Sequence, residues 1–129
     1  MGTEYLAKCN KCGTEFRVRE GGGFIFHLLH CDKCGKEKSV KFGELGENHI
    51  RFIKGLDIPY SSVSADSDRS IQENYPGSAI TQEQYYSEVE KIAGKCSCGG
   101  QYYLSAKARC PKCHSDNYMN TGIGTIDYD

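Results

Sequence analysis

The sequence predicts a small, metal-stabilised α+β fold, in which two four-cysteine modules of short antiparallel strands are joined by a connector that contains one helix. Three observations predict it. The 129 residues include eight cysteines, which fall into two groups of four near the two ends of the chain. Short runs beside the cysteines alternate apolar and polar residues, as half-buried strands do. One segment between the groups, residues 82–93, has the capping signals and the periodicity of a helix.

The first group of cysteines has the spacing of a structural zinc site. Its members are Cys9, Cys12, Cys31 and Cys34. Two residues separate the cysteines of each pair, and eighteen residues lie between the pairs. A two-residue spacer lets one tight turn direct both sulfurs at a single ion. Gly13 and Gly35 follow the pairs, where a positive φ angle would turn backbone N–H groups toward the sulfurs.

The second group predicts another four-thiolate site. Its members are Cys96, Cys98, Cys110 and Cys113. Only one residue separates the first two, although Gly99 and Gly100 leave that turn room to chelate. Pro111 suits a tight turn because its fixed φ angle costs nothing there. His114 stands where the first group has glycine, and histidine tolerates a left-handed backbone.

Both segments resemble the zinc ribbon family, also called rubredoxin-like. The resemblance rests on Cys9-Asn10-Lys11-Cys12-Gly13 with Cys31-Asp32-Lys33-Cys34-Gly35, and on Cys98-Gly99-Gly100 with Cys110-Pro111-Lys112-Cys113. It covers roughly residues 1–42 and 95–124 and implies paired knuckles on short antiparallel strands around zinc. It implies no particular function. We therefore expect three parts: an N-terminal zinc ribbon over 1–42, an acidic connector over 43–94, and a C-terminal zinc ribbon with a tail over 95–129.

The connector holds one clear helix. Thr81 and Gln84 form a capping box, and Gly94 supplies a stop, so a helix is expected over residues 82–93. Its apolar face should cover a ribbon, and the two ribbons could then dock together. Residues 47–54 fit a helix or a strand equally. Residues 55–77 are rich in Ser, Asp, Gly and Pro and predict mainly loop.

Zinc is favoured over the other uses of paired cysteines. The start of the chain lacks the basic and apolar runs of a secretion signal, and no apolar stretch has membrane-spanning length. We therefore expect a cytoplasmic protein, in which paired cysteines indicate metal rather than disulfides. Iron, held as in a rubredoxin electron carrier, is the alternative ion, since four thiolates suit either. Two zinc ions per chain are expected, and a chelator should unfold each ribbon.

Charge limits the possible partners. The formal net charge is −1, and two four-thiolate zinc sites would lower it to about −5. Strong nucleic-acid binding normally needs a basic surface, so a protein partner is favoured. The alternative is nucleic-acid binding through the N-terminal ribbon. The residues that could carry it are Arg17, Arg19, Lys38, Lys41, Phe16 and Phe24.

No catalytic constellation stands out. The sequence has no P-loop, nucleophile elbow or H-E-x-x-H motif, and an all-cysteine site leaves no open position on the metal. The four histidines are His27, His30, His49 and His114. They are expected to support the ligands or lie at the surface, because eight cysteines already fill two sites. The function expected from sequence is therefore a non-enzymatic zinc-binding adaptor, with nucleic-acid binding and iron electron transfer as alternatives.

Overall fold

The computed structural model describes residues 2–128 and places seven strands and four helices along them. In chain order these are β1 (Gly2–Cys9), β2 (Glu15–Glu20), β3 (Phe26–Cys31), β4 (Glu37–Lys41), α1 (Phe42–Leu45), α2 (Glu47–Lys54), α3 (Ala65–Asn74), α4 (Gln82–Ala93), β5 (Tyr102–Tyr103), β6 (Tyr118–Asn120) and β7 (Ile126–Tyr128). The fold is thus α+β, with antiparallel strands at both ends of the chain and the helices between them.

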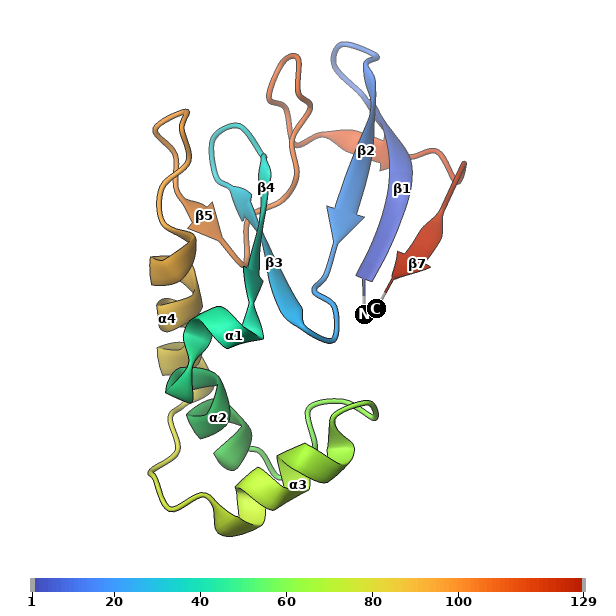
Figure 1. Ribbon diagram of the computed structural model, residues 1–129. Coiled ribbons are helices and arrows are strands. Elements are labelled where there is room, and N and C mark those ends of the chain that lie inside the picture. The colour runs from blue at the N-terminus through green and yellow to red at the C-terminus, as the bar shows by residue number, and fades with distance from the viewer. Residues whose placement is uncertain (1, 129) are drawn as a thin grey trace.

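The strands form two sheets, and each sheet combines the two ends of the chain. Sheet A has the order β2-β1-β6, and β7 also pairs with β1; sheet B has the order β4-β3-β5. All pairings are antiparallel. Figure 1 shows the sheets side by side, with α4 and α2 on the side of sheet B that lies away from sheet A. The sequence predicts separate ribbons over residues 1–42 and 95–129. In the structure, the C-terminal strands β5, β6 and β7 instead pair with the N-terminal strands β3 and β1.

Strand β1 is the centre of sheet A. Its pairing with β2 runs from Thr3↔Glu20 to Lys8↔Glu15, and β6 and β7 follow its other edge. Tyr5, Ala7 and Cys9 are buried at alternate positions, as one inward face of a strand requires. The sequence makes no prediction for the tail after residue 120. In the structure this tail adds the strand β7 to the sheet.

Helix α4 begins and ends where sequence predicts. The Thr81 N–H bonds the Gln84 side chain at 2.9 Å, and the Gln84 N–H bonds the Thr81 hydroxyl at 3.1 Å. This reciprocal box satisfies two N–H groups that the first turn leaves without helical partners. Gly94 ends the helix at φ 73°. Tyr85 and Val89 are fully buried, whereas Tyr86 is 37% exposed.

The connector is more helical than expected. Residues 47–54, which sequence left open between helix and strand, form α2. The prediction of mainly loop over 55–77 is wrong for α3, whose first turn includes Asp68. That carboxylate is buried and accepts hydrogen bonds from the Tyr60 N–H at 2.8 Å and the Ser64 hydroxyl at 2.7 Å. The polar residues that suggested a loop therefore stabilise the start of a helix through hydrogen bonds.

Two groups of buried side chains form the core. The larger lies between sheet B and helices α2 and α4, and the smaller lies on sheet A around Tyr5 and Val18. In the larger group the rings of Phe52 and Tyr85 stack with centroids 4.1 Å apart. Among residues 2–128, no helix has both the length and the apolar character needed to cross a membrane.

Candidate metal centres

The eight cysteines gather into two groups, and the members of each group come from both ends of the chain. The outer cluster is Cys9, Cys12, Cys110 and Cys113, and the inner cluster is Cys31, Cys34, Cys96 and Cys98. Within each cluster all four sulfurs lie within 4.8 Å of one another. Each cluster therefore brings four thiols close enough to hold one metal ion.

This grouping corrects the one expected from sequence. Sequence combined neighbouring pairs, Cys9 and Cys12 with Cys31 and Cys34, and Cys96 and Cys98 with Cys110 and Cys113. The structure exchanges the partners because β1 pairs with β6 and β3 pairs with β5. Those pairings carry each N-terminal cysteine pair to a C-terminal one. The same eight side chains remain the candidate ligands.

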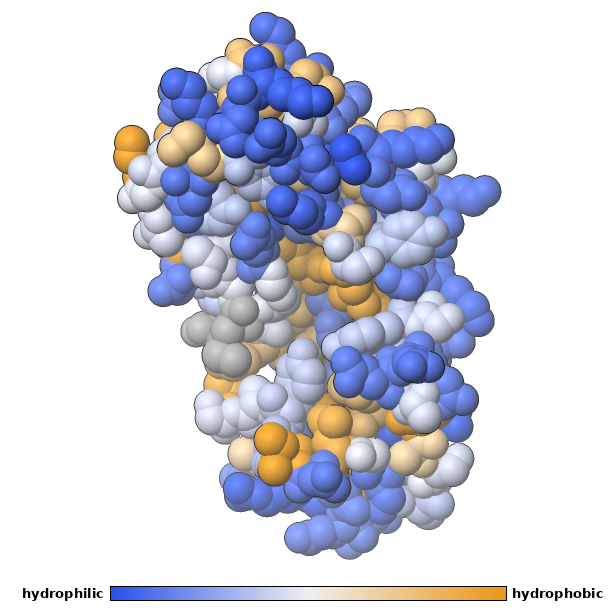
Figure 2. Space-filling view, turned by 180° about the vertical axis from the view of Figure 1, so that it is seen from behind, coloured by the Kyte–Doolittle hydropathy of each residue, from blue (hydrophilic) through white to orange (hydrophobic). Residues whose placement is uncertain are grey.

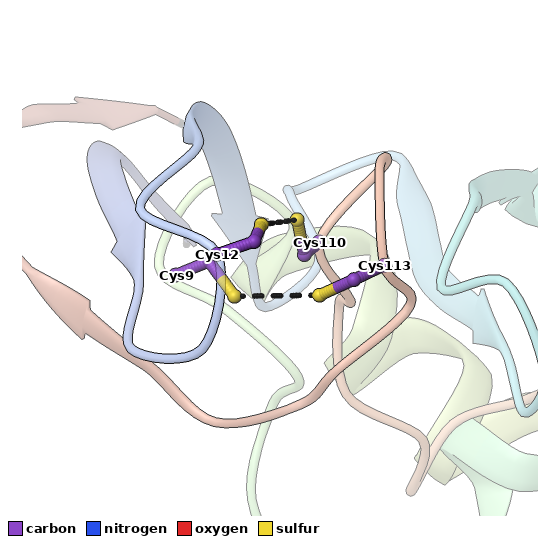
Figure 3. A group of neighbouring side chains, drawn as sticks. All are labelled: Cys9, Cys12, Cys110 and Cys113. Carbon is purple, nitrogen blue, oxygen red and sulfur yellow. Dashed lines mark hydrogen bonds between the residues drawn. The ribbon is translucent and has the colours of Figure 1, made fainter.

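The outer cluster lies where the β1–β2 turn meets the turn before β6. Cys9 Sγ is 3.5 Å from Cys113 Sγ, and Cys12 Sγ is 3.5 Å from Cys110 Sγ. Figure 3 shows the four side chains pointing toward one another from these two turns. Four sulfurs placed tetrahedrally at the zinc–sulfur distance of about 2.3 Å would lie about 3.8 Å apart. The observed separations are close to that value, so the cluster fits an ion of zinc size.

The inner cluster has the same form in sheet B. Cys31 Sγ is 3.4 Å from Cys98 Sγ, and Cys34 Sγ is 3.6 Å from Cys96 Sγ. Cys31 and Cys96 are buried, whereas Cys98 is exposed, so the cluster lies just beneath the surface. The one-residue spacer between Cys96 and Cys98 is accommodated by a tighter turn, in which the Gly99 N–H bonds the Cys96 carbonyl at 3.0 Å.

The turns have the backbone geometry that sequence predicts. Gly13 and Gly35 adopt φ angles of 76° and 74°, and His114 adopts 61° at the matching position of the third turn. In all three turns this residue's N–H bonds the carbonyl of the first cysteine, at 2.8 to 3.0 Å. A left-handed residue is thus what closes each C-x2-C turn.

Hydrogen bonds and burial shift the pKa values of the thiols. The Thr14 hydroxyl lies 3.1 Å from Cys12 Sγ and, with the Thr14 backbone, lowers the pKa of that thiol to about 6. The Cys98 backbone N–H, and after it the Tyr102 hydroxyl, lower the pKa of Cys96 to about 6. Burial instead raises the pKa of Cys34 to about 12. Stabilised thiolates suit metal binding, because the thiolate is the ligand form of cysteine.

Two pairs of polar residues that sequence reasoning missed connect the halves of each cluster. In the outer cluster, the Asn10 N–H bonds the Asn117 carbonyl at 3.0 Å and the two side-chain amides bond at 2.8 Å. In the inner cluster, the Asp32 N–H bonds the Gln101 carbonyl, and the Asp32 carboxylate accepts the Gln101 N–H, both at 3.0 Å. Asn10 and Asp32 each follow the first cysteine of a knuckle, which is the signal that could have found them.

The histidines are not part of either four-sulfur group. His27 and His49 both bond the buried Tyr85 hydroxyl at 2.7 Å, through Nε2 and Nδ1 respectively. Burial, and then the neighbouring His49, lower the pKa of His27 to about 4. His30 is buried beside Cys31, and His114 supplies the turn conformation described above.

The basic residues considered for nucleic-acid binding are partly engaged. Arg17 forms an ion pair with Glu4 at 2.8 Å, and Arg19 forms one with Glu37 at 2.8 Å. The ring of Phe16 packs edge-on against Tyr118 rather than standing free to stack on a base. Lys38 and Lys41 are exposed on β4.

Comparison with known protein families gives a match over most of the chain. A family described as "Domain of unknown function (DUF8255)" matches residues 5–119, which include both cysteine clusters. No curated protein matches the chain. No solved structure matches it either.

Proposed function

We propose that this chain, which belongs to the DUF8255 family, is a two-zinc protein whose zinc-ribbon-like sites are structural and whose role is non-catalytic binding of a protein partner. The observation that carries the proposal is the composition of the two clusters. Each offers four cysteine sulfurs, two from each end of the chain, within 4.8 Å of one another. Four thiolates complete the tetrahedral coordination of zinc and leave no position for a substrate.

The structural role follows from where the clusters lie. Cys12 and Cys110 are 98 residues apart in sequence, and Cys34 and Cys96 are 62 residues apart. An ion at each cluster would therefore cross-link distant segments and restrict the unfolded chain. The strands that need this support are short, since β5 has two residues and β6 has three.

Iron is the alternative occupant, because four thiolates bind either metal. Elemental analysis and an absorption spectrum of the untagged protein separate the two. The proposal predicts about two zinc ions per chain and no visible colour. Iron with visible charge-transfer bands would overturn it and favour electron transfer.

A chelator experiment tests the structural role directly. Removal of zinc should abolish the near-ultraviolet signal of the buried tyrosines, and zinc added back should restore it, because binding and folding are linked. Retention of the signal after complete zinc removal, shown by elemental analysis, would contradict a structural role.

A further inference from the structure

A cleft of about 940 Å³ lies apart from both cysteine clusters, between the two sheets and helix α4. Its floor includes Leu28 on β3 and Leu104, Ala106 and Ala108 on the segment that joins the inner cluster to the outer one. Figure 2, which views the molecule from behind, shows hydrophobic surface in a hollow at the middle of this face. The volume of the cleft lies within the range of ligand-binding clefts.

Three carboxylates surround this floor. Glu83 and Glu90 are seven residues apart and share one face of α4, and Glu20 ends β2. The Leu104 N–H bonds Glu90 Oε2 at 3.0 Å, and the Tyr5 hydroxyl bonds Glu20 Oε1 at 2.7 Å. Each of these two carboxylates is thereby fixed in place through one oxygen.

The three cleft carboxylates outnumber the one lysine or arginine side chain that lines the cleft. The ion pairs among residues 2–128 involve Glu4, Glu37 and Glu88, and none involves the three cleft carboxylates. The cationic side chain that lines the cleft is Lys107, whose ammonium lies 5.0 Å from the Tyr118 ring centroid and 3.4 Å from the Asp116 carbonyl.

Aromatic and neutral polar groups complete the walls. Tyr86 lies on α4 between Glu83 and Glu90, and Tyr60 precedes α3. The face of a tyrosine ring attracts a cation, and a carboxylate forms a charge-assisted hydrogen bond with one, so the two kinds of side chain together favour a cationic ligand. His27 also lines the cleft, and its lowered pKa keeps it uncharged at neutral pH.

From this combination we infer that the cleft receives an arginine or lysine side chain of a protein partner, flanked by apolar residues. The cation would pair with a carboxylate of the cleft, Glu83 being the one on the first turn of α4, and the flanking residues would cover the apolar floor. A free amino acid would leave much of the 940 Å³ unfilled, whereas a peptide segment of several residues matches it. The inference rests on the proposed function, since it specifies the partner and needs the zinc-loaded fold.

The test is a titration of zinc-loaded protein, whose two zinc ions are verified first, with the capped tripeptide Leu-Arg-Leu. Its matched control replaces arginine by citrulline, which keeps the shape and removes the charge. Binding should weaken about tenfold or more with citrulline, and amide resonances of the cleft residues should shift only with the arginine peptide. Added salt should weaken binding as well.

Two variants on the same helix test the position. Glu83→Gln removes a cleft carboxylate and should weaken the arginine peptide about threefold, as expected for a partly exposed charge pair. Glu88→Gln removes a carboxylate that pairs with Lys91 outside the cleft and should change nothing. Equal binding of the arginine and citrulline peptides, equal effects of the variants, or no binding at millimolar peptide would overturn the inference. With two zinc ions present, each of those results would leave the structural zinc proposal standing.

Discussion

The nested arrangement of the clusters predicts that loss of the inner one weakens zinc binding at the outer one. The perturbation is the double variant Cys31→Ser, Cys34→Ser, which removes half of the inner ligands and none of the outer. If each cluster were instead made of neighbouring pairs in sequence, one complete four-cysteine site would survive in this variant with its own short loop.

The size of the effect follows from loop closure, whose free-energy cost grows as about (3/2)RT ln n for a flexible loop of n residues. With the inner cluster open, the outer one closes a loop of 98 residues between Cys12 and Cys110. With the inner cluster formed, the open part of that loop shortens to roughly 30 residues. The difference is about 1 kcal/mol, or about fivefold in zinc affinity. Gly35 approaches the backbone of Arg109 closely, so packing between the two knuckle regions adds to this value.

The assay is zinc competition against a chelator of known affinity, applied to the variant and to the native chain. We expect the outer cluster of the variant to bind zinc at least about fivefold more weakly than in the native chain. Coupling between sites is reciprocal, so Cys9→Ser, Cys12→Ser should weaken the inner cluster by the same factor. An unchanged affinity at the remaining cluster in both variants would refute the nested arrangement.

Three further predictions concern stability. Gly13→Ala should lower the free energy of unfolding by about 1–2 kcal/mol, because alanine is strained at the positive φ angle of that position. Gly35→Ala should lower it further, because the new Cβ would also overlap the backbone of Arg109. Chemical denaturation compares the two variants, and equal losses of stability would contradict the close approach. Tyr85→Phe should lower the free energy of unfolding by about 1–3 kcal/mol, because it removes the hydroxyl that the buried His27 and the half-buried His49 both bond. A change near zero by the same method would argue against those bonds. Because burial lowers the pKa of His27 to about 4, the unfolded chain binds a proton there before the folded chain does as pH falls. The contribution of His27 to the free energy of unfolding should therefore be constant above about pH 6.5 and fall by about 3 kcal/mol toward pH 4. The difference in free energy of unfolding between the native chain and His27→Gln, measured with excess zinc across this range, isolates that contribution, and a difference that does not change with pH would contradict it.

Features set by a few adjacent residues could be predicted from the sequence. The box of Thr81 and Gln84 fixes the start of α4, and Gly13 and Gly35 take the positive φ angles that their place after each cysteine pair indicates. These conformations depend on contacts within one turn, so neighbouring residue types suffice to specify them.

The combination of cysteine pairs could not be predicted in the same way. Four pairs can combine into two clusters in three ways, and the chemistry of the sulfurs is the same in each. What decides is the pairing of β1 with β6 and of β3 with β5, which involves residues about a hundred and about seventy positions apart in sequence. The sequence does contain a pattern typical of strand β1, since Tyr5 and Ala7 are apolar residues two positions apart and both are buried. It indicates a strand but not its partner.

Helix α3 was missed for a different reason. Its first turn contains Asp66, Ser67 and Asp68, residue types that compete with helical hydrogen bonds and so suggest a loop. Burial of Asp68 against the Tyr60 N–H and the Ser64 hydroxyl reverses that preference. Both partners lie within eight residues of Asp68 in the sequence, but residue composition alone does not show that the chain turns back to bring them to this carboxylate.

The zinc content of two four-serine variants tests the central claim most directly. The first replaces Cys9, Cys12, Cys110 and Cys113, which are the whole outer cluster; the second replaces Cys9, Cys12, Cys31 and Cys34, which are half of each. Both variants lose four thiols, so composition alone does not distinguish them. The nested arrangement predicts about one tightly bound zinc in the first variant and none in the second. One zinc in the second variant and none in the first would show that each site is formed by neighbouring pairs and would contradict the account.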